Sequence, residues 1–551
     1  MKENEEREEL RLLREALEAK KEKNEKKNDE ENIEQEEKKK PEEKKQPEKP
    51  ENETESREPS EKVLESYSFN AQGVPVDVKV IETKESYVPQ YIIQIPLIAE
   101  GTKLILNALK AELITKVKLD LAMLTDQRQM KDIQLKFEQK ANELLDKQFP
   151  SLTPEKRKVL SSYLIQNTLG LGELEILMAD DNLEDIVING PAEPIQVYHK
   201  RHGWCSTNLW IKRDDTVYEY AANIGRRVGR QINVLNPIMN AYLPNGDRVN
   251  ATLSPISSFG NTLSIRKFAK NPWTIPYLIN VKTITPEVAS LIWLCIQNEI
   301  SLLSSGGTGS GKTSFLNAMA CMIPPNQRII SIEDTRELSL PDFLHWVAMT
   351  TREPNPEGKG EITMLDLMVN ALRQRPDRII VGEVRRQREA EVLFEAMHTG
   401  HSVYATFHAD NAEECVNRLT TPPINVPTSS MTALGGIIVQ YRNRRSGIRR
   451  TFEFAEITNE GKANVVYRWD PKSDTIKEVE AITRLGETLA LYTGMTVKEM
   501  KLDLLEKTKI LKWMVNKKYF DINEVGRITA DYYMDNEKVV EYATASKDWV
   551  F

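Results

Sequence analysis

One short motif constrains the fold of this chain more than any other feature of its sequence. Residues 306–313 are Gly-Gly-Thr-Gly-Ser-Gly-Lys-Thr, which is the spacing of a phosphate-binding loop. An apolar segment at 300–304 precedes the motif, and a segment typical of a helix follows it at 314–322. A glycine-rich turn between a strand and a helix points its backbone N–H groups at an anion, at the positive end of the helix. We therefore expect an α/β domain with a nucleotide site.

The residue types within the motif indicate their roles. Lys312 should reach the β- and γ-phosphates, and the hydroxyl of Thr313 should bind Mg²⁺. A purely structural glycine turn would not explain why the spacing, the Lys-Thr pair and both flanks agree. ATP and Mg²⁺ are therefore the expected substrate and cofactor. The expected nucleotide-binding residues are Gly306, Gly307, Thr308, Gly309, Ser310, Gly311, Lys312, Thr313 and Ser314.

Two further apolar segments end in carboxylates. Residues 378–383 form a Walker B pattern in which glycine replaces the usual aspartate, so Glu383 is the expected acid. At the end of a buried parallel strand it would face the Mg²⁺ and its waters. The segment 328–334 ends in Glu333 and Asp334. A P-loop ATPase needs a group that orients or deprotonates the attacking water; we expect Glu333 in that role, with Asp334 as a cap or turn residue.

Two of the six histidines, His401 and His408, lie within eight residues of each other. A neutral imidazole can sense a γ-phosphate or hold a water, but both side chains could equally be structural. No cysteine or acid completes a metal-ligand set around them. The four cysteines are far apart and form no CxxC pair, so we expect neither a zinc site nor a disulfide framework, and a reducing compartment fits.

Residues 1–62 differ sharply from the rest of the chain. They contain 40 charged side chains and only eight apolar ones, too few to offset the entropy of ordering the segment. We expect a disordered tail, with Leu10, Leu13 and Leu17 at helical spacing as its one amphipathic stretch. Six of the chain's eight net negative charges lie in this tail. The remainder is near neutral, without the basic bias that nucleic-acid binding favours.

Periodicity and turn residues outline the remaining elements. Alternating segments at 63–96 predict strands, and two helices are expected at 101–124 and 127–149. Thr153 and Pro154 begin another helix, as cap and first helical residue. The expected elements that follow are strands at 184–188 and 195–199, a helix at 215–232, paired strands within 243–268 and a linker at 269–276. No window approaches the ~20 apolar residues of a membrane helix, so we expect a cytoplasmic protein.

Taken together, these segments resemble the secretion-ATPase superfamily, which powers type II and type IV secretion, type IV pili and archaella. The resemblance covers about residues 150–460. Within the superfamily it is nearest to the archaellum motor ATPases, on residues 376–386, 446–450 and 454–457. The segments that carry the superfamily resemblance are 306–313, Glu333-Asp-Thr-Arg-Glu337, Leu372-Arg-Gln-Arg-Pro-Asp377, Gly382-Glu383, the histidine segment 399–409, and in the first half 170–190, 243–248 and 264–267.

The resemblance implies a fold, a function and partners. The expected fold is α/β, with an N-terminal α/β region at 63–275 and a RecA-like P-loop ATPase domain at 276–551, after the disordered tail at 1–62 that composition alone predicts. The N-terminal region would be helical at about 101–170, with the superfamily's N-terminal domain at about 171–268, and a C-terminal helical extension would start at about 484. The implied function is Mg-dependent ATP hydrolysis by a homo-hexamer peripherally bound to the cytoplasmic membrane face. It would assemble or rotate the archaellum through a polytopic membrane platform protein and other archaellar cytoplasmic components.

Other functions remain open. One is the ATPase of an archaeal type IV pilus or type II-like secretion system. A nucleic-acid translocase is a further alternative, as is a nucleotide-gated scaffold that barely turns over; no nucleic-acid partner is expected.

The resemblance also implies roles for individual residues. Glu333 would activate water, Glu383 would act on Mg²⁺ through water, and His408 would sense phosphate. Arg248 and Arg266 match the arginines that reach across to the nucleotide, a task that suits a permanently charged bidentate group. Competing candidates are Arg226, Arg227 and Arg230. Each arginine could instead form a surface ion pair.

Overall fold

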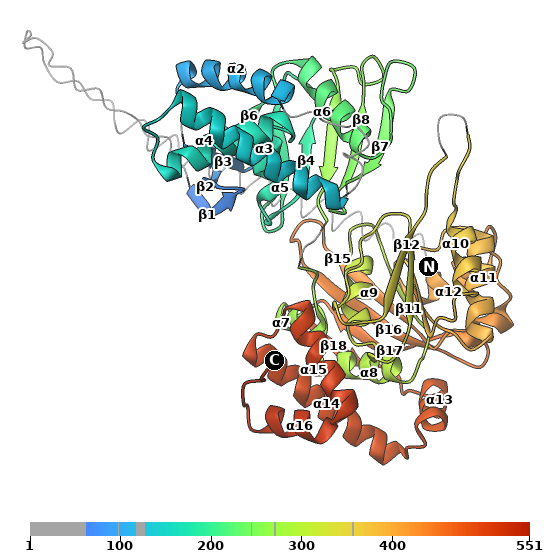
Figure 1. The fold of residues 1–551 in the computed structure, drawn as a ribbon. Coiled ribbons are helices and arrows are strands. Elements are labelled where there is room, and N and C mark those ends of the chain that lie inside the picture. Colours follow the sequence, from blue (N-terminus) through green and yellow to red (C-terminus); the bar gives the residue numbers. More distant parts are fainter. Residues whose placement is uncertain (1–61, 97, 117–126, 244, 269–270, 355–357) are drawn as a thin grey trace, which may run out of the picture. The chain divides into compact units, whose positions relative to one another are not determined.

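The computed structural model describes residues 62–96, 98–116, 127–243, 245–268, 271–354 and 358–551. This part of the chain forms two nine-stranded sheets with helices around them (Figure 1). The predicted α/β fold class is confirmed. Apart from Lys62, the expected tail at 1–62 lies outside the described residues, and so do Leu10, Leu13 and Leu17.

The first sheet contains the strands of the N-terminal region. Its order is β1-β2-β3-β6-β5-β4-β9-β8-β7, and every pairing is antiparallel except that of β3 with β6. The strands are β1 (Lys62–Ala71), β2 (Val74–Glu82), β3 (Gln90–Gln94), β4 (Leu183–Ile188), β5 (Pro194–His199), β6 (Gly203–Trp210), β7 (Ile238–Tyr242), β8 (Arg248–Thr252) and β9 (Thr262–Arg266).

Alternation along the strands of this sheet sets which face is buried. In β2, Val74, Val76, Val78 and Val80 all point into the core while the residues between them are exposed. The same core includes apolar residues of α5 (Leu174–Ala179) and α6 (Asp214–Arg227). The other face therefore carries the polar members of each alternation.

Three helices between β3 and β4 form an apolar cluster of their own. They are α2 (Glu100–Lys116), α3 (Gln127–Gln148) and α4 (Pro154–Thr168). The side chain of Thr153 accepts a hydrogen bond from the backbone of Lys156 at 3.5 Å, and Pro154 stands at the first helical position. The predicted start of α4 is confirmed.

The second sheet contains the P-loop strand at its centre. Its order is β12-β11-β13-β14-β10-β15-β16-β17-β18; the strands from β12 to β15 are parallel, and β16, β17 and β18 extend the sheet antiparallel. The strands are β10 (Leu302–Gly306), β11 (Ile329–Glu333), β12 (Trp346–Thr350), β13 (Arg378–Val381), β14 (Ser402–Phe407), β15 (Gly436–Arg442), β16 (Arg449–Ile457), β17 (Ala463–Asp470) and β18 (Thr475–Glu478).

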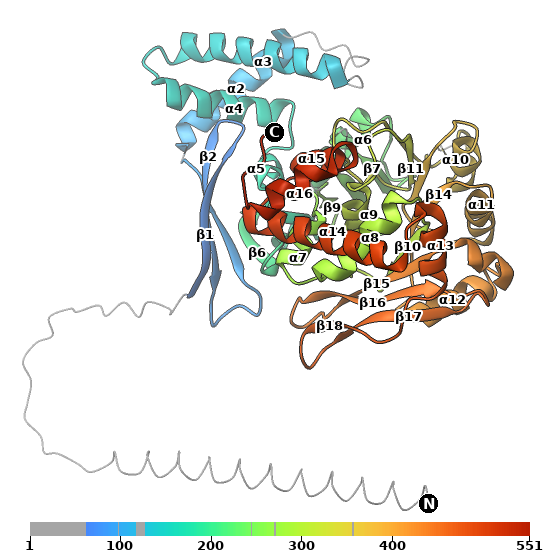
Figure 2. The same ribbon diagram turned by 90° about the horizontal axis from the view of Figure 1, so that it is seen from below.

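Helices cover both faces of this sheet. Leu302 and Leu303 are adjacent in β10 but belong to different apolar clusters, one on each face, which explains the continuous apolar runs in its parallel strands. One cluster holds α7 (Ile275–Asn280), α8 (Pro286–Gln297), α9 (Lys312–Ala320), α13 (Arg484–Thr493), α14 (Val497–Lys517), α15 (Ile522–Met534) and α16 (Asn536–Thr544). The other holds α10 (Met364–Ala371), α11 (Gln387–His398) and α12 (Ala412–Thr420). Figure 2 shows α14 running beside α8.

The expected linker at 269–276 is partly wrong. Residues 269 and 270 lie outside the described part, but α7 already begins at Ile275. Pro276 falls in its first turn, where a missing N–H costs nothing and the fixed φ suits a helix. The helix expected at 215–232 likewise stops at Arg227, because Gly229 adopts a left-handed conformation with φ 68°. Among the described residues, no helix combines the length and the hydropathy needed to cross a membrane.

Candidate nucleotide site

The parallel order brings the sequence motifs to one edge of the second sheet. β10 ends at Gly306, β14 at Phe407, β13 at Val381 and β11 at Glu333. Because these four strands are parallel neighbours, their carboxyl ends meet at the same edge. The P-loop, the histidine segment, the Walker B segment and Glu333 are therefore adjacent, although they are far apart in the chain.

The P-loop itself has a conformation that only glycine permits at its first position. Gly306 has φ 144°, and a Cβ built on it would lie 2.2 Å from the carbonyl oxygen of Gln440. Gly309 and Gly311 also have positive φ, at 71° and 100°. The Oγ of Ser310 is buried in the loop and has no hydrogen-bond partner. The loop is thus held tightly, with a polar group left over for a ligand.

Lys312, at the start of α9, contacts only neutral groups among its hydrogen-bond partners. Its Nζ donates to the carbonyl of Gly307 at 3.0 Å and lies 3.2 Å from Nδ1 of His408. Burial lowers the pKa of Lys312, against the opposing effect of Glu383. A cation without a direct carboxylate contact beside a P-loop is well placed to receive phosphate.

His408 connects the lysine to the Walker B acid. Its Nε2 lies 2.8 Å from Oε1 of Glu383, so a neutral ring that donates from Nε2 leaves Nδ1 to accept from Lys312. Burial, and then the charge of Lys312, lower the pKa of His408, which favours this neutral form. His401 lies at the other end of β14, near the carbonyl oxygen of Ala396 and the Thr399 hydroxyl. Only one of the two histidines is therefore part of the site.

The Walker B carboxylate is also paired with an arginine that the sequence analysis did not single out. Arg385 bonds to Oε2 of Glu383 at 2.5 Å and to Oδ2 of Asp334 at 3.0 Å. Asp334, expected as a cap or turn residue, also accepts from the hydroxyl of Thr351 at 3.3 Å. It belongs to the ion-pair network of the site. The sequence offered one indication of this role: Arg385 lies two residues after Glu383, the predicted Walker B acid.

Glu333 is the most deeply buried carboxylate at this edge, with 1% of its surface exposed. Its Oε1 accepts from the backbone N–H groups of Glu337 at 2.9 Å and Leu338 at 3.0 Å, while Oε2 is buried without a partner. Burial raises the pKa of Glu333 to about 7. A Cβ on Gly382 would touch the Glu333 side chain at 3.4 Å. Glycine in place of the usual Walker B aspartate therefore keeps a second acid away from Glu333.

The oxygen donors expected for Mg²⁺ fit that ion. Thr313 lies half-buried in the first turn of α9, next to the lysine. Hydroxyl and carboxylate oxygens, few in number and supplemented by phosphate and water, are what Mg²⁺ requires. Both oxygens of Glu383 already have partners, which agrees with an action on Mg²⁺ through water.

The two arginines expected to reach the nucleotide belong to the first sheet. The Nε of Arg266 pairs with Oδ1 of Asp185 at 2.8 Å, which raises the pKa of Arg266. Arg248 stands directly opposite Arg266 on the neighbouring strand. Of the competing candidates, Arg227 donates to the carbonyl of Leu169, and Arg230 donates to that of Pro354 at 3.2 Å.

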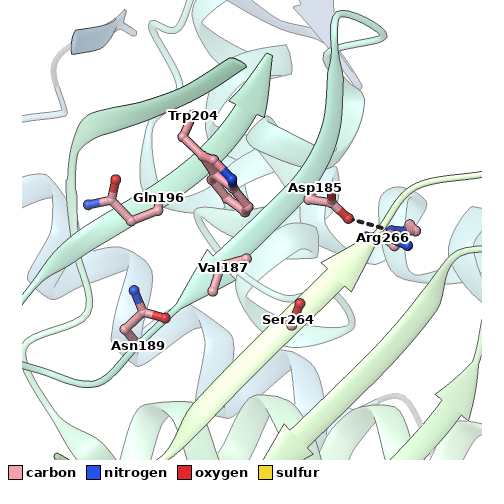
Figure 3. Close-up of a pocket in the computed structure, with 7 residues that line it drawn as sticks. All are labelled: Asp185, Val187, Asn189, Gln196, Trp204, Ser264 and Arg266. Carbon is pink, nitrogen blue, oxygen red and sulfur yellow. Dashed lines mark hydrogen bonds and ion pairs between the residues drawn. The ribbon is translucent and has the colours of Figure 1, made fainter. Parts of the chain in front are cut away.

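Arg266 lines a cavity of about 430 Å³ on the polar face of the first sheet (Figure 3). The dashed line in Figure 3 marks its ion pair with Asp185. Because Arg266 is exposed, it can leave this ion pair and bind another anion. The cavity is lined by Asp185, Val187, Asn189, Gln196, Trp204, Ser264 and Arg266.

Another cluster of possible metal ligands lies in the first sheet, formed by Glu65, His199 and His202. The Nδ1 of His199 accepts from the backbone N–H groups of Arg201 at 3.2 Å and His202 at 3.4 Å. This fixes the proton on Nε2, the atom that faces Glu65 at 4.0 Å. A protonated nitrogen cannot ligate a metal, and Arg201 already neutralises Glu65. These hydrogen bonds and this ion pair account for Nδ1 of His199 and for Glu65, while Nε2 of His199 is buried without a partner.

Comparison with known proteins places residues 172–445 in a family described as type II/IV secretion system protein. An uncharacterized protein of Methanocaldococcus jannaschii is 36% identical over 396 residues, covering 69% of this chain and 71% of that protein. A putative conjugal transfer protein of Mycobacterium tuberculosis is 30% identical over 323 residues, covering 54% of this chain and 88% of that protein. The type IV secretion system protein PtlH of Bordetella pertussis is 29% identical over 276 residues, or 46% of this chain and 80% of that protein.

A solved structure also matches. The X-ray structure of the Legionella pneumophila ATPase DotB is 18% identical and covers 70% of this chain and 96% of that one, with a TM-score of 0.40. A score of that size is too low to establish that the two chains superpose as wholes.

Proposed function

Because the chain belongs to the type II/IV secretion ATPase superfamily, we propose that it hydrolyses ATP at the carboxyl edge of its second sheet. One observation carries this proposal. A P-loop, its lysine and two carboxylates, Glu383 and Glu333, converge from neighbouring parallel strands, and His408 links the lysine to Glu383. Phosphoryl transfer needs positioning and charge stabilisation more than covalent chemistry, and this edge supplies both.

Each residue has a distinct part in the proposed mechanism. The backbone N–H groups of the P-loop bind the phosphates. Lys312 gives up its contacts with the carbonyl of Gly307 and with His408 and donates to phosphate oxygens instead. Mg²⁺, held by Thr313 and through water by Glu383, would supply positive charge to the phosphates. Glu333 accepts the proton of the attacking water on its free Oε2. His408, released by Lys312, reports whether the γ-phosphate is present.

The proposed work of this ATPase is mechanical. We place it in a homo-hexamer that acts on a polytopic membrane platform protein, with other archaellar cytoplasmic components, to assemble or rotate the archaellum. The sequence resemblance at 376–386, 446–450 and 454–457 supports the archaellum over a type IV pilus or a type II-like secretion system. In a genetically tractable archaeon that encodes this protein, deletion should abolish swimming and leave pili intact. Loss of pili with normal swimming would favour the pilus alternative.

Glu383→Gln tests the hydrolysis directly. The amide preserves shape but not charge, so turnover should fall about 10²-fold or more while nucleotide affinity stays nearly unchanged. Phosphate release and binding of a fluorescent ATP analogue measure the two quantities. Turnover within a few-fold of wild type would show that Glu383 is not the Walker B acid.

Single-stranded DNA should leave the ATPase rate unchanged, whereas the ATPase rate of a nucleic-acid translocase would be stimulated.

Arg266 and Arg248 are proposed to act on the nucleotide of a neighbouring subunit. Arg266 would then leave its ion pair with Asp185 and bind a phosphate of that nucleotide. Mixing two inactive variants, Arg266→Ala and Glu383→Gln, creates interfaces that pair a wild-type arginine with a wild-type acid. Partial activity should return, because an arginine acting in trans is worth about 10³–10⁵ in rate in other P-loop enzymes. If mixing restores nothing, the arginines do not act in trans.

A further inference from the structure

The hairpin of β15 and β16 places two arginines beside the P-loop. Arg442, the last residue of β15, is directly opposite Arg449, the first residue of β16. β15 is also the parallel neighbour of β10, with Gln440 level with Gly306. A Cβ built on Gly309 would lie 3.0 Å from Nη1 of Arg442, and one built on Gly311 would lie 3.9 Å from Cδ of Arg449. Both side chains therefore border the loop.

No ion pair among the described residues neutralises the positive charges of this pair, although Glu184 lies near enough to interact electrostatically with both. The Nε atoms of Arg442 and Arg449 are both buried without a hydrogen-bond partner. Arg442 donates from Nη2 to the neutral hydroxyl of Tyr198 at 2.8 Å, and Arg449 lies over the ring of Trp273 at 5.4 Å. Neither forms an ion pair with a carboxylate in the part of the chain that the structure describes. Burial, and then the charge of Arg442, lower the pKa of Arg449.

The next arginine in the chain shows what a compensated charge looks like here. Arg450 grips Asp474 with two hydrogen bonds, from Nε at 2.7 Å and from Nη2 at 2.8 Å. Like charges directly opposite on paired strands are unfavourable, and so are buried donors without acceptors. Arg442 and Arg449 carry both costs, and both would be relieved by an anion at the P-loop.

We infer that Arg442 and Arg449 bind the phosphates of the nucleotide nearest to the nucleoside. This rests on the proposed function, because it assumes that a nucleotide occupies the loop. The position of β15 in the sheet indicates which phosphates the two arginines contact. β15 flanks β10 on one side, and β14, which leads to His408 and the Walker B acid, flanks it on the other. Groups on the β15 side therefore contact the end of the polyphosphate that hydrolysis does not change.

A kinetic signature follows from this position. The phosphates near the nucleoside are present in both ADP and ATP and gain no charge in the transition state. Contacts to them strengthen substrate and transition state alike, so their loss should raise KM and leave kcat unchanged. This differs from changes at Glu383 or Glu333, which should lower kcat.

The test uses Arg442→Ala and Arg449→Met, the second of which keeps an aliphatic stem on Trp273. Arg444→Ala is the matched control, since Arg444 is exposed on the same hairpin and its removal changes the net charge equally. Each of the first two variants should bind fluorescent ADP and ATP about 10- to 100-fold more weakly, the range of a hydrogen bond to a charged group. Their kcat at saturating ATP should stay within about twofold of wild type. The control should match wild type in both affinity and kcat.

Melting temperature without nucleotide separates binding from structure. Removing one of two opposed charges should leave the melting temperature of the free protein unchanged or higher, while the stabilisation by ADP shrinks. Affinity within twofold of wild type in both variants would overturn the inference, and so would weaker binding that comes with a markedly lower melting temperature of the free protein. Lys312→Ala keeps the two proposals apart: if it also binds nucleotide normally, the proposed function has failed, and if only it loses binding, the inference alone is wrong.

Discussion

The second sheet has an amino edge, where its parallel strands begin, and a carboxyl edge, where they end. Arg378 at the amino edge contrasts with the polar groups around the P-loop at the carboxyl edge. Arg378 begins β13 and is fully buried, yet four of the five N–H groups of its guanidinium donate hydrogen bonds. It donates to Gln327 at 2.7 Å, Ser402 at 2.7 Å, Tyr404 at 2.6 Å and the carbonyl of Ile296 at 2.7 Å. At the opposite edge, where the same strand ends before Glu383, several buried polar atoms have no partner: Ser310 Oγ, Glu333 Oε2, Arg442 Nε and Arg449 Nε.

This difference separates structure from function within one sheet. Folding leaves few buried polar atoms unsatisfied, and each exception needs an explanation. At the bonded edge Arg378 links α8, β14 and the segment before β11, although Arg328 Nε and Gln297 Oε1 at this edge have no partner. The other edge, which we call the unsatisfied edge, carries the P-loop. Its polar atoms without hydrogen-bond partners are best explained as binding sites for a phosphate ligand and an attacking water. Changes at the two edges should then have different consequences.

The largest effect is expected for Glu333→Gln. An amide cannot accept the proton of the attacking water, so turnover should fall about 10²- to 10⁴-fold, the usual worth of a general base. Nucleotide affinity should change little. Asp342→Asn, at an exposed acid that follows β11, is the control. Normal turnover in Glu333→Gln would show that another group activates the water.

Arg378→Met should instead destabilise the fold. The methionine fills much of the same space but leaves several buried acceptors and hydroxyls unbonded, at a cost of about 3 kcal/mol in the free energy of unfolding. Urea denaturation measures this quantity. Folded protein should bind nucleotide as wild type does. A selective loss of nucleotide affinity without loss of stability would erase the distinction between the two edges.

At the carboxyl edge, turnover and stability should depend on pH with opposite signs, because both follow the ionisation of Glu333. Because burial raises the pKa of Glu333 to about 7, its active ionised form increases with pH, and turnover should rise about tenfold from pH 6 to pH 8. Stability should move the other way. The folded protein disfavours the ionised form, so the free energy of unfolding should fall by up to about 3 kcal/mol as pH rises from 4.5 through 7. Glu333→Gln should remove both slopes, and a slope that persists in the variant belongs to another group.

Sequence alone predicted what depends on local patterns. The strand–loop–helix order around 306–313 and the carboxylates after apolar runs require only neighbouring residues. The start of α4 at Thr153 and Pro154 is of the same kind. Parallel pairing of β10, β14, β13 and β11 then explains why Glu333, Glu383 and His408 lie at the same edge of the sheet. Their spacing in the chain does not reveal this.

The missed residues depend on contacts between distant strands. Arg442 and Arg449 border the P-loop only because β15 pairs with β10, and Arg385 bridges Glu383 to Asp334 only because β13 lies beside β11. Arg378 looked like the first residue of an apolar strand, since its neutral partners come from three other segments. Arg266 was expected to face the nucleotide, and its ion pair with Asp185 depends on the register of β4 and β9.

The most direct test of this account is whether the unsatisfied edge binds nucleotide through Lys312. Fluorescent ATP should be titrated into wild type, Lys312→Ala and a control, Lys509→Ala, which removes an exposed lysine on α14. Loss of the main cationic partner of the phosphates should weaken binding about 10²-fold or more in Lys312→Ala, with the control unchanged. Equal affinity in all three proteins would contradict the assignment of this edge as the nucleotide site.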